Sequence, residues 1–134
     1  MWVFALISPM NVLIFSEGRV RLTAITKFSL DNFPTGWVVG NFSPAVLSTE
    51  KFEFGVKSFS ANQTEPCHFQ KSAVELTVVI AGRISIGGVQ ASVGEIIVVP
   101  PGVHGGFVAL TDCQLAVLKS PSAIDDKVMC GDSH

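Results

Sequence analysis

The residues best suited to chemistry lie in the stretch EPCHFQKSAVE, residues 65–75. His68 and Gln70 are two residues apart, so on a β-strand their side chains share one face. Glu75 follows a turn expected at 71–73 and begins the next antiparallel strand, from which its carboxylate can point to the same place. An imidazole nitrogen, an amide oxygen and a carboxylate converging in this way could bind a divalent cation. The same three residues could instead form a hydrogen-bonded polar cluster inside the fold, because buried polar groups need partners.

Strands must position these residues, and the whole chain has the pattern of an all-β protein. Its apolar runs are short, rich in Val, Ile and Phe, and end at Gly, Pro, Asn or Asp, and no stretch has a convincing helical period. Short strands at this spacing usually form a sandwich or barrel. Besides the strand that carries His68 and Gln70, we expect strands at residues 3–7, 12–15, 20–26, 37–41, 53–60, 75–81, 83–86, 95–98, 106–110 and 114–119.

Length and composition indicate one domain with an apolar surplus. The chain has 134 residues, of which 48% are hydrophobic and 15% charged. This is more apolar side chain than a small single domain usually buries, so we expect a homodimer. Residues 1–35 are predicted to form strands that extend the barrel or the dimer interface, 36–121 the barrel itself, and 122–134 an irregular or short helical tail.

Charge and cysteine content exclude several classes of protein. The 9 basic and 11 acidic residues are scattered and give a formal charge of −2, so nucleic acid is a poor candidate partner. The apolar N-terminus lacks a basic region and a cleavage site, and Pro9 interrupts it, so no membrane segment is expected. Three cysteines at irregular spacing do not suggest a disulfide framework. We therefore expect a reducing, cytoplasmic location, with Cys67 as a buried, inert thiol on the face opposite His68.

The spacing continues beyond Glu75 and resembles the two sequence motifs of the cupin superfamily. The first is usually H-x-H, three or four residues, E, six residues, G, and the second is G, five residues, P-x-G, two residues, H. This chain reads His68-Phe69-Gln70, four residues, Glu75, six residues, Gly82, and then Gly94, five residues, Pro100-Pro101-Gly102, with His104 one place early. The core resemblance covers residues 55–107. Weaker likeness to small single-domain bacterial cupins, a functionally unassigned subgroup, extends it to 36–127.

The resemblance implies a conical β-barrel, the double-stranded β-helix or jelly roll, that binds one Fe, Mn, Ni or Zn ion and no organic cofactor. His68 and Glu75 match ligand positions, Gln70 replaces a histidine, and His104 is displaced so that Gly105 falls in the ligand slot. Glutamine is a zinc ligand in the corresponding motif of sugar-phosphate isomerases that resemble cupins. The resemblance thus implies a metal site at His68, Gln70 and Glu75, with His104 or water completing it.

Two main functions remain open from the sequence, besides a purely structural subunit whose barrel interior would be filled by side chains. The first is a small-molecule-binding cupin whose metal could act on a small polar substrate such as a sugar or carboxylate. The alternative is a non-catalytic ligand-binding or interaction module in which the metal site has decayed. The sequence does not decide whether the protein is an enzyme, and it assigns no catalytic residue. Because the chain has no tyrosine, it lacks the tyrosine acid of the cupin-like deoxysugar epimerases.

Overall fold

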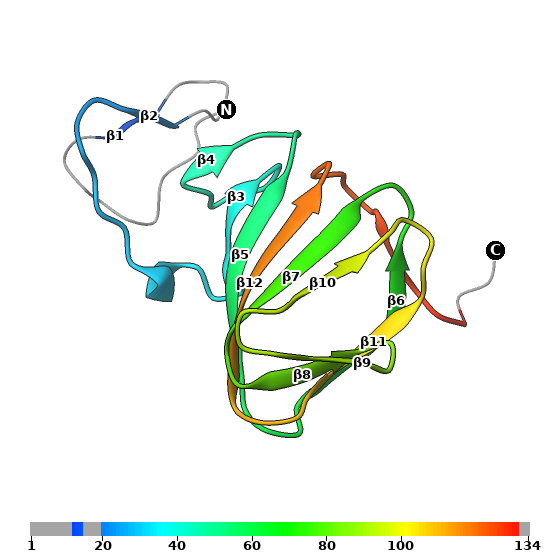
Figure 1. Cartoon of the computed structure of the whole chain (residues 1–134). Coiled ribbons are helices and arrows are strands. Elements are labelled where there is room, and N and C mark those ends of the chain that lie inside the picture. The colour runs from blue at the N-terminus through cyan, green and yellow to red at the C-terminus, as the bar shows by residue number, and fades with distance from the viewer. Residues whose placement is uncertain (1–11, 15–19, 132–134) are drawn as a thin grey trace.

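The protein is described by a computed structural model that covers residues 12–14 and 20–131. Within these residues the structure is all-β apart from one short 3-10 helix (Figure 1). The elements are β1 (Val12–Ile14), β2 (Val20–Leu22), η1 (Leu30–Asn32), β3 (Trp37–Gly40), β4 (Leu47–Ser48), β5 (Glu53–Phe59), β6 (Thr64–Gln70), β7 (Val74–Ala81), β8 (Arg83–Ile86), β9 (Val89–Ser92), β10 (Ile96–Val99), β11 (Gly105–Ala109), β12 (Cys113–Ser120) and β13 (Lys127–Met129).

Two sheets face each other and enclose the core. One has six strands in the order β10-β7-β12-β5-β3-β4, and the other has five in the order β13-β6-β11-β8-β9. Figure 1 shows the two layers curving around a common interior. The predicted all-β barrel is therefore confirmed. The buried core consists of Val79, Ile84, Ala91, Ile97, Phe107, Ala109, Cys113, Leu115 and Val117.

Most of the predicted strands are present, with three additions. The strands β4, β9 and β13 were not expected, and the one predicted at 3–7 lies outside the described residues. The run VQAS of β9 contains one large apolar residue, too few to show alternation, and it is paired with β8 through a turn at Gly87 and Gly88. In the tail, residues 127–129 form β13 against β6 instead of an irregular or helical segment.

The N-terminal strands β1 and β2 pair with each other in a sheet of their own. Among the described residues, neither pairs with a strand of the two larger sheets. Their predicted role in extending the barrel or forming a dimer interface stays a prediction. Among the same residues, no helix is long and apolar enough to cross a bilayer.

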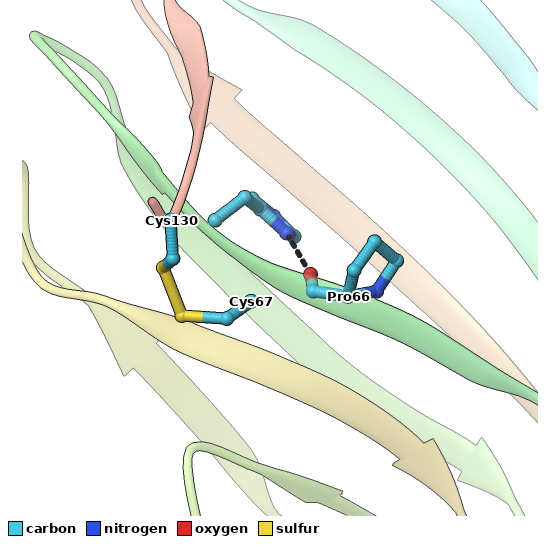
Figure 2. The surroundings of a disulfide bond; sticks show 4 residues. Pro66, Cys67 and Cys130 are labelled. Carbon is cyan, nitrogen blue, oxygen red and sulfur yellow. Dashed lines mark hydrogen bonds between the residues drawn. A yellow bond between two sulfur atoms is a disulfide. The ribbon is translucent and has the colours of Figure 1, made fainter. Parts of the chain in front are cut away.

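The cysteines differ from the sequence-based expectation. Cys67 is exposed and forms a disulfide with Cys130, with 5.4 Å between their Cα atoms (Figure 2). The cause is the pairing of β13 with β6, which sets Cys130 beside Cys67 so that the Cys130 N–H donates to the Cys67 carbonyl at 3.0 Å. Cys113 is free and buried, and burial raises the pKa of its thiol. The prediction of a buried, inert Cys67 thiol was wrong, and the reducing, cytoplasmic location inferred from free cysteines loses its support.

Gly82, the glycine of the first motif, has a steric role at the turn between β7 and β8. Its φ is +79°, in the region that side chains rarely adopt. A Cβ atom at this position would overlap the carbonyl oxygen of Asp112. Glycine is therefore required here by the close approach of the β11–β12 connection, independently of any ligand.

Candidate metal and ligand site in the barrel

A cavity of about 170 Å³ opens between the two sheets. It is comparable to the roughly 150 Å³ of an engineered cavity that binds benzene, so it suits a small molecule. Its apolar wall includes Phe59, Ile86, Val99, Phe107, Leu115 and Val117. Its polar and aromatic lining includes Trp37, Lys57, Glu65, His68, Gln70, Glu75, Thr77, Lys119 and Lys127. The structure thus brings three of the four predicted ligands, His68, Gln70 and Glu75, to one cavity.

His68 lies on β6 and presents one ring nitrogen for binding. Its Nδ1 is 3.0 Å from the carbonyl oxygen of Pro66, the contact drawn as a dashed line in Figure 2. A carbonyl only accepts hydrogen bonds, so Nδ1–H must be the donor and Nε2 carries the lone pair. A backbone carbonyl on the second nitrogen is the usual way in which proteins orient a metal-binding histidine.

Gln70 is buried in the cavity wall with an unpaired amide. It is 4% exposed, and its Nε2 has no hydrogen-bond partner. Rotation of the amide exchanges Oε1 with Nε2, so this position can present an acceptor oxygen to a cation or a donor to a ligand. The Gly102 N–H donates to the Gln70 main-chain oxygen at 2.7 Å, which joins the loop of the second motif to the strand of the first. A buried unpaired amide is costly, so it indicates a missing partner.

Glu75 lies at the start of β7, between two neighbouring strands. It pairs with Val99 on β10 and with Lys119 on β12. The Lys119 Nζ is 3.9 Å from Glu75 Oε2 and 3.6 Å from Glu53 Oε1. The Glu75 carboxylate is therefore already partly neutralised by an ammonium, which a metal ion at the site would have to displace or tolerate.

His104 is not brought to this group. Its side chain is exposed and stacks on Phe69, with ring centroids 4.5 Å apart and planes inclined by 8°. The reason is the register of β11 with β6, in which Gly105, not His104, lies opposite His68 and lines the cavity. Adjacent strand residues point to opposite sides, so His104 points outward. The one-residue shift seen in the sequence thus moves this imidazole from the cavity to the outer surface.

The types of donor atom at the cavity fit a divalent cation, but only three protein residues would act as its ligands. His68 offers an imidazole nitrogen, Gln70 an amide and Glu75 a carboxylate, the donor set of borderline to hard metals. Catalytic zinc sites also use three protein ligands and leave a position open. With His104 outside, a metal here would depend on these three residues and on solvent or a bound molecule.

Three lysines at the cavity were missed by the sequence reasoning. Lys57, Lys119 and Lys127 line it together with Glu65 and Glu75, an excess of one positive charge. No carboxylate of the described residues lies within 4.0 Å of the Lys57 or Lys127 ammonium. The signal was present in the predicted strands 53–60 and 114–119, since alternation puts a lysine on the same face as the core residues of each.

Lys57 is half-buried and lies over the ring of Trp37. Its Nζ lies 4.6 Å from the Trp37 ring centroid, and the Lys119 Nζ lies 4.9 Å from it. Burial lowers the pKa of Lys57 below its usual 10.5, Glu65 opposes this shift, and the like charge of Lys119 adds to it. A half-buried ammonium without an ion-pair partner has the properties of an anion-binding group.

Glu65 reaches the cavity because of a β-bulge. Between β11 and β6 the register steps from Gly105↔His68 to Phe107↔Glu65, so β6 has one extra residue in this interval. Regular alternation would have turned Glu65 away from His68. Pro66, which has no N–H for the ladder, lies inside the bulge. The bulge therefore allows the side chains of both Glu65 and His68 to face the cavity.

Asp126 holds the turn that joins the two ligand-bearing strands. Its carboxylate accepts hydrogen bonds from the Ser72 N–H and Ala73 N–H, each at 2.9 Å, and from the Ser72 hydroxyl. Its main-chain oxygen accepts from the Lys71 N–H at 2.9 Å. Burial alone would raise the pKa of Asp126, but these hydrogen bonds and the Lys71 charge lower it below 3.8. The segment before β13 thus fixes the spacing of Gln70 and Glu75.

The comparisons with known proteins agree on the architecture. No family model and no curated protein matches the sequence. Among solved structures, KdgF from a Halomonas species is similar with a TM-score of 0.51 and 24% identity, covering 58% of this chain and 74% of that chain. An uncharacterized conserved protein with a double-stranded beta-helix domain from Klebsiella pneumoniae has a TM-score of 0.53 and 17% identity, covering 63% and 78%.

An RmlC-like cupin from Shewanella frigidimarina is similar with a TM-score of 0.51 and 23% identity, covering 58% of this chain and 72% of that chain. At these identities the likeness concerns the fold alone. It agrees with the two facing sheets and with the motif spacing from His68 to Gly102. The chain therefore has the cupin fold, the double-stranded β-helix.

Proposed function

We propose that the protein binds a small anionic molecule, such as a carboxylate, in the barrel cavity, together with a divalent cation at His68, Gln70 and Glu75. The observation that carries this proposal is the cavity itself, which combines an apolar wall, an excess of lysine charge and an unpaired buried amide. A concave apolar site with a few convergent polar groups is the usual form of a small-molecule site.

The residues have separable roles in this proposal. The Lys57 and Lys127 ammonium groups bind the anionic group of the ligand, and the wall around Phe107 and Leu115 contacts its apolar part. The Gln70 amide, whose Nε2 has no hydrogen-bond partner among the described residues, pairs with the bound ligand. A bound divalent cation would supply Lewis-acid chemistry at the same place.

Replacing Lys57 with methionine is expected to weaken binding of a carboxylate ligand by about tenfold or more. A hydrogen bond to a charged group contributes about 1.5–3 kcal/mol, and methionine keeps the length of the side chain without its charge. Isothermal titration with a panel of small carboxylates and matched neutral sugars measures the effect. Lys51→Met removes an exposed lysine outside the cavity lining and should leave affinity unchanged. Equal affinity of wild type and Lys57→Met for every ligand bound would contradict the role of Lys57.

The pH dependence of binding follows from the same lysine. Because burial lowers the pKa of Lys57, its ammonium loses its proton at lower pH than an ordinary lysine. Affinity for a carboxylate should be full below this lowered pKa and fall as the pH rises through it. Titrations across the alkaline range should show this fall in wild type and a flatter profile in Lys57→Met. The same profile in both proteins would show that another group titrates.

Metal binding is tested directly on oxidised protein purified without chelator. We expect one equivalent of Fe, Mn, Ni or Zn by mass spectrometry, lost in His68→Ala and kept in His104→Ala, because His104 does not line the cavity. A protein that carries no metal, and whose thermal midpoint does not respond to added Fe²⁺, Mn²⁺, Ni²⁺ or Zn²⁺, would contradict this part of the proposal. Carboxylate binding could still hold, since it depends on Lys57.

Two observations favour the alternative, a non-catalytic ligand-binding module whose metal site has decayed. The Lys119 ammonium lies 3.9 Å from Glu75, where a cation would otherwise neutralise the carboxylate, and His104 points outward. In this alternative the Lys119 ammonium neutralises the Glu75 carboxylate in place of a metal ion. Ligand binding by metal-free protein would support it, while the loss of ligand binding on chelation would contradict it.

A homodimer is proposed from an apolar row on the outer face of β7 and β10. The register pairs Ile96 with Val78 and Val98 with Leu76, all on the side opposite Glu75 and Thr77. Ile96 and Val98 are 57% and 54% exposed in the single chain. A sheet face of this kind usually packs against another protein surface.

The disulfide favours an oxidising compartment over the cytoplasm for this molecule.

Light scattering of the full chain tests the dimer. We expect a dimer for wild type and a monomer for Ile96→Lys, since a charge in the buried centre of the interface is costly. Gln90→Lys, an exposed change on β9 of the other sheet, is the matched control and should stay dimeric. A monomeric wild type, or a dimeric Ile96→Lys, would exclude this face.

A further inference from the structure

The outer face of β6 carries a second group of metal-binding side chains, separate from the cavity. His68 and Gln70 line the cavity, and Phe69 borders it while stacking on the exposed His104 ring. Strand alternation turns the exposed Cys67 to the side opposite His68. Cys130 is held beside Cys67 by the main-chain hydrogen bond between them. His104 reaches the same place from the loop before β11. The ligand atoms of Cys67, His104 and Cys130 all lie within 4.8 Å of one another.

The distances allow the three residues to share one ion once the disulfide is open. Two thiolates on one zinc, at about 2.3 Å each, lie about 3.8 Å apart in tetrahedral geometry. The Cα atoms of the two cysteines are 5.4 Å apart, so rotation of the two side chains can bring both sulfurs to one ion without separating the strands. Besides the disulfide, β13 is joined to β6 by main-chain pairing at residues 127–129.

The His104 ring is placed for this role and has no other partner among the described residues. Its stacking on Phe69 fixes the plane of the ring. Within the described part of the chain, neither ring nitrogen of His104 forms a hydrogen bond or ion pair with another side chain. Its contacts are with the aromatic ring below and the two sulfur atoms beside it.

We propose that Cys67, Cys130 and His104 form a zinc site in the reduced protein, which the disulfide closes in the oxidised protein. Two molecules of a thiol reductant supply two electrons and two protons, which convert the disulfide into two cysteine thiols, and they leave as a disulfide. A phosphine instead supplies two electrons, takes the oxygen of one water molecule to become a phosphine oxide, and the two protons of that water go to the cysteine sulfurs. Zn²⁺ then binds both sulfurs and the imidazole with release of two protons to solvent. Two cysteines, one histidine and an open fourth position form a known zinc donor set. Hard cations such as Mg²⁺ do not prefer thiolates.

Metal titrations of oxidised and reduced protein test this site. The protein is reduced with a phosphine, separated from the reductant without air, and titrated with zinc chloride, magnesium chloride or cobalt chloride alone. We expect one more equivalent of zinc in the reduced than in the oxidised protein, no added magnesium, and thiolate-to-cobalt charge-transfer absorption. Both should be absent from the Cys67→Ser/Cys130→Ser variant, which keeps Cys113.

Two histidine variants separate this site from the cavity. The extra equivalent should persist in His68→Ala, whose imidazole lies on the other face of β6. It should bind more than about 100-fold more weakly in His104→Ala, since changes outside the first ligands alone cost roughly 10- to 100-fold. Unchanged affinity in His104→Ala, loss in His68→Ala, or equal zinc binding by oxidised and reduced protein would each overturn the proposal.

The effect of zinc on the thermal unfolding midpoint still tests the site if reduction destabilises the protein, because both proteins compared are reduced. Zinc should raise the unfolding midpoint of reduced wild type, because a ligand that binds the folded state stabilises it. It should not raise the midpoint of reduced His104→Ala. A rise of the same size in both would mean that His104 does not contribute to zinc binding by the folded protein, which would also overturn the proposal.

Discussion

Reduction of the Cys67–Cys130 disulfide is expected to lower the free energy of unfolding by about 4 kcal/mol. The bond joins residues separated by 63 positions, and in the chain-entropy model a loop of this length restricts the unfolded chain by about that amount. It also ties β13, and with it Lys127 of the cavity lining, to β6. Denaturant titrations with and without reductant, both with a chelator to exclude zinc, measure the difference.

The Cys67→Ser/Cys130→Ser variant is the matched control. Its stability should equal that of reduced wild type and should not change when reductant is added. Cys113 is buried and unpaired, so it contributes no reductant-sensitive bond among the described residues. If wild type unfolds at the same denaturant concentration with and without reductant, the disulfide does not stabilise the fold.

Replacing Asp126 with asparagine is expected to cost about 3 kcal/mol of stability and to loosen the turn between Gln70 and Glu75. Asp126 is 7% exposed, and its carboxylate accepts hydrogen bonds from Ser72 and Ala73 through both of its oxygens. Asparagine has one acceptor oxygen, so at least one buried donor loses its partner, and hydrogen bonds to charged groups contribute about 1.5–3 kcal/mol. Denaturant titration at neutral pH measures the loss. Asp125→Asn, an exposed change at the neighbouring residue, should have little effect.

The contribution of Asp126 has a defined pH window. Because its pKa is lowered in the folded protein, the stabilisation is present in full above the unfolded pKa, near 3.8, and is lost as the pH falls through the folded-state value. The stability difference between wild type and Asp126→Asn should therefore shrink at acid pH. A difference that stays constant from neutral to acid pH would show that the carboxylate charge is not what holds the turn at 71–73.

Strand alternation and motif spacing were enough to predict most of the cavity motif. Two residues on one strand of a pleated sheet must share a face, so His68 and Gln70 could be assigned to one side without a structure. Glu75 follows the turn that Asp126 holds, and all three line one cavity. That they bind a metal stays a prediction. The all-β fold followed from the short apolar runs, which are local properties of the chain.

The direction of His104 and the inward position of Glu65 could not be predicted. Both depend on the register of β11 with β6, which sets Gly105 opposite His68 and includes a bulge. Register arises from the packing of two strands, and a shift of one residue turns every following side chain to the other face. The sequence showed that His104 was displaced by one residue, but not to which side of the barrel.

The sequence by itself determined the fold class and the shared face of His68 and Gln70, because both follow from the period of a single strand. Only the tertiary structure decided that Lys57 and Lys119 enclose the same cavity as Glu75, and that Cys67 meets Cys130. Those contacts depend on which strands become neighbours when the two sheets form. Neighbouring strands are set by long-range packing, and residues 63 positions apart carry no local pattern that records it.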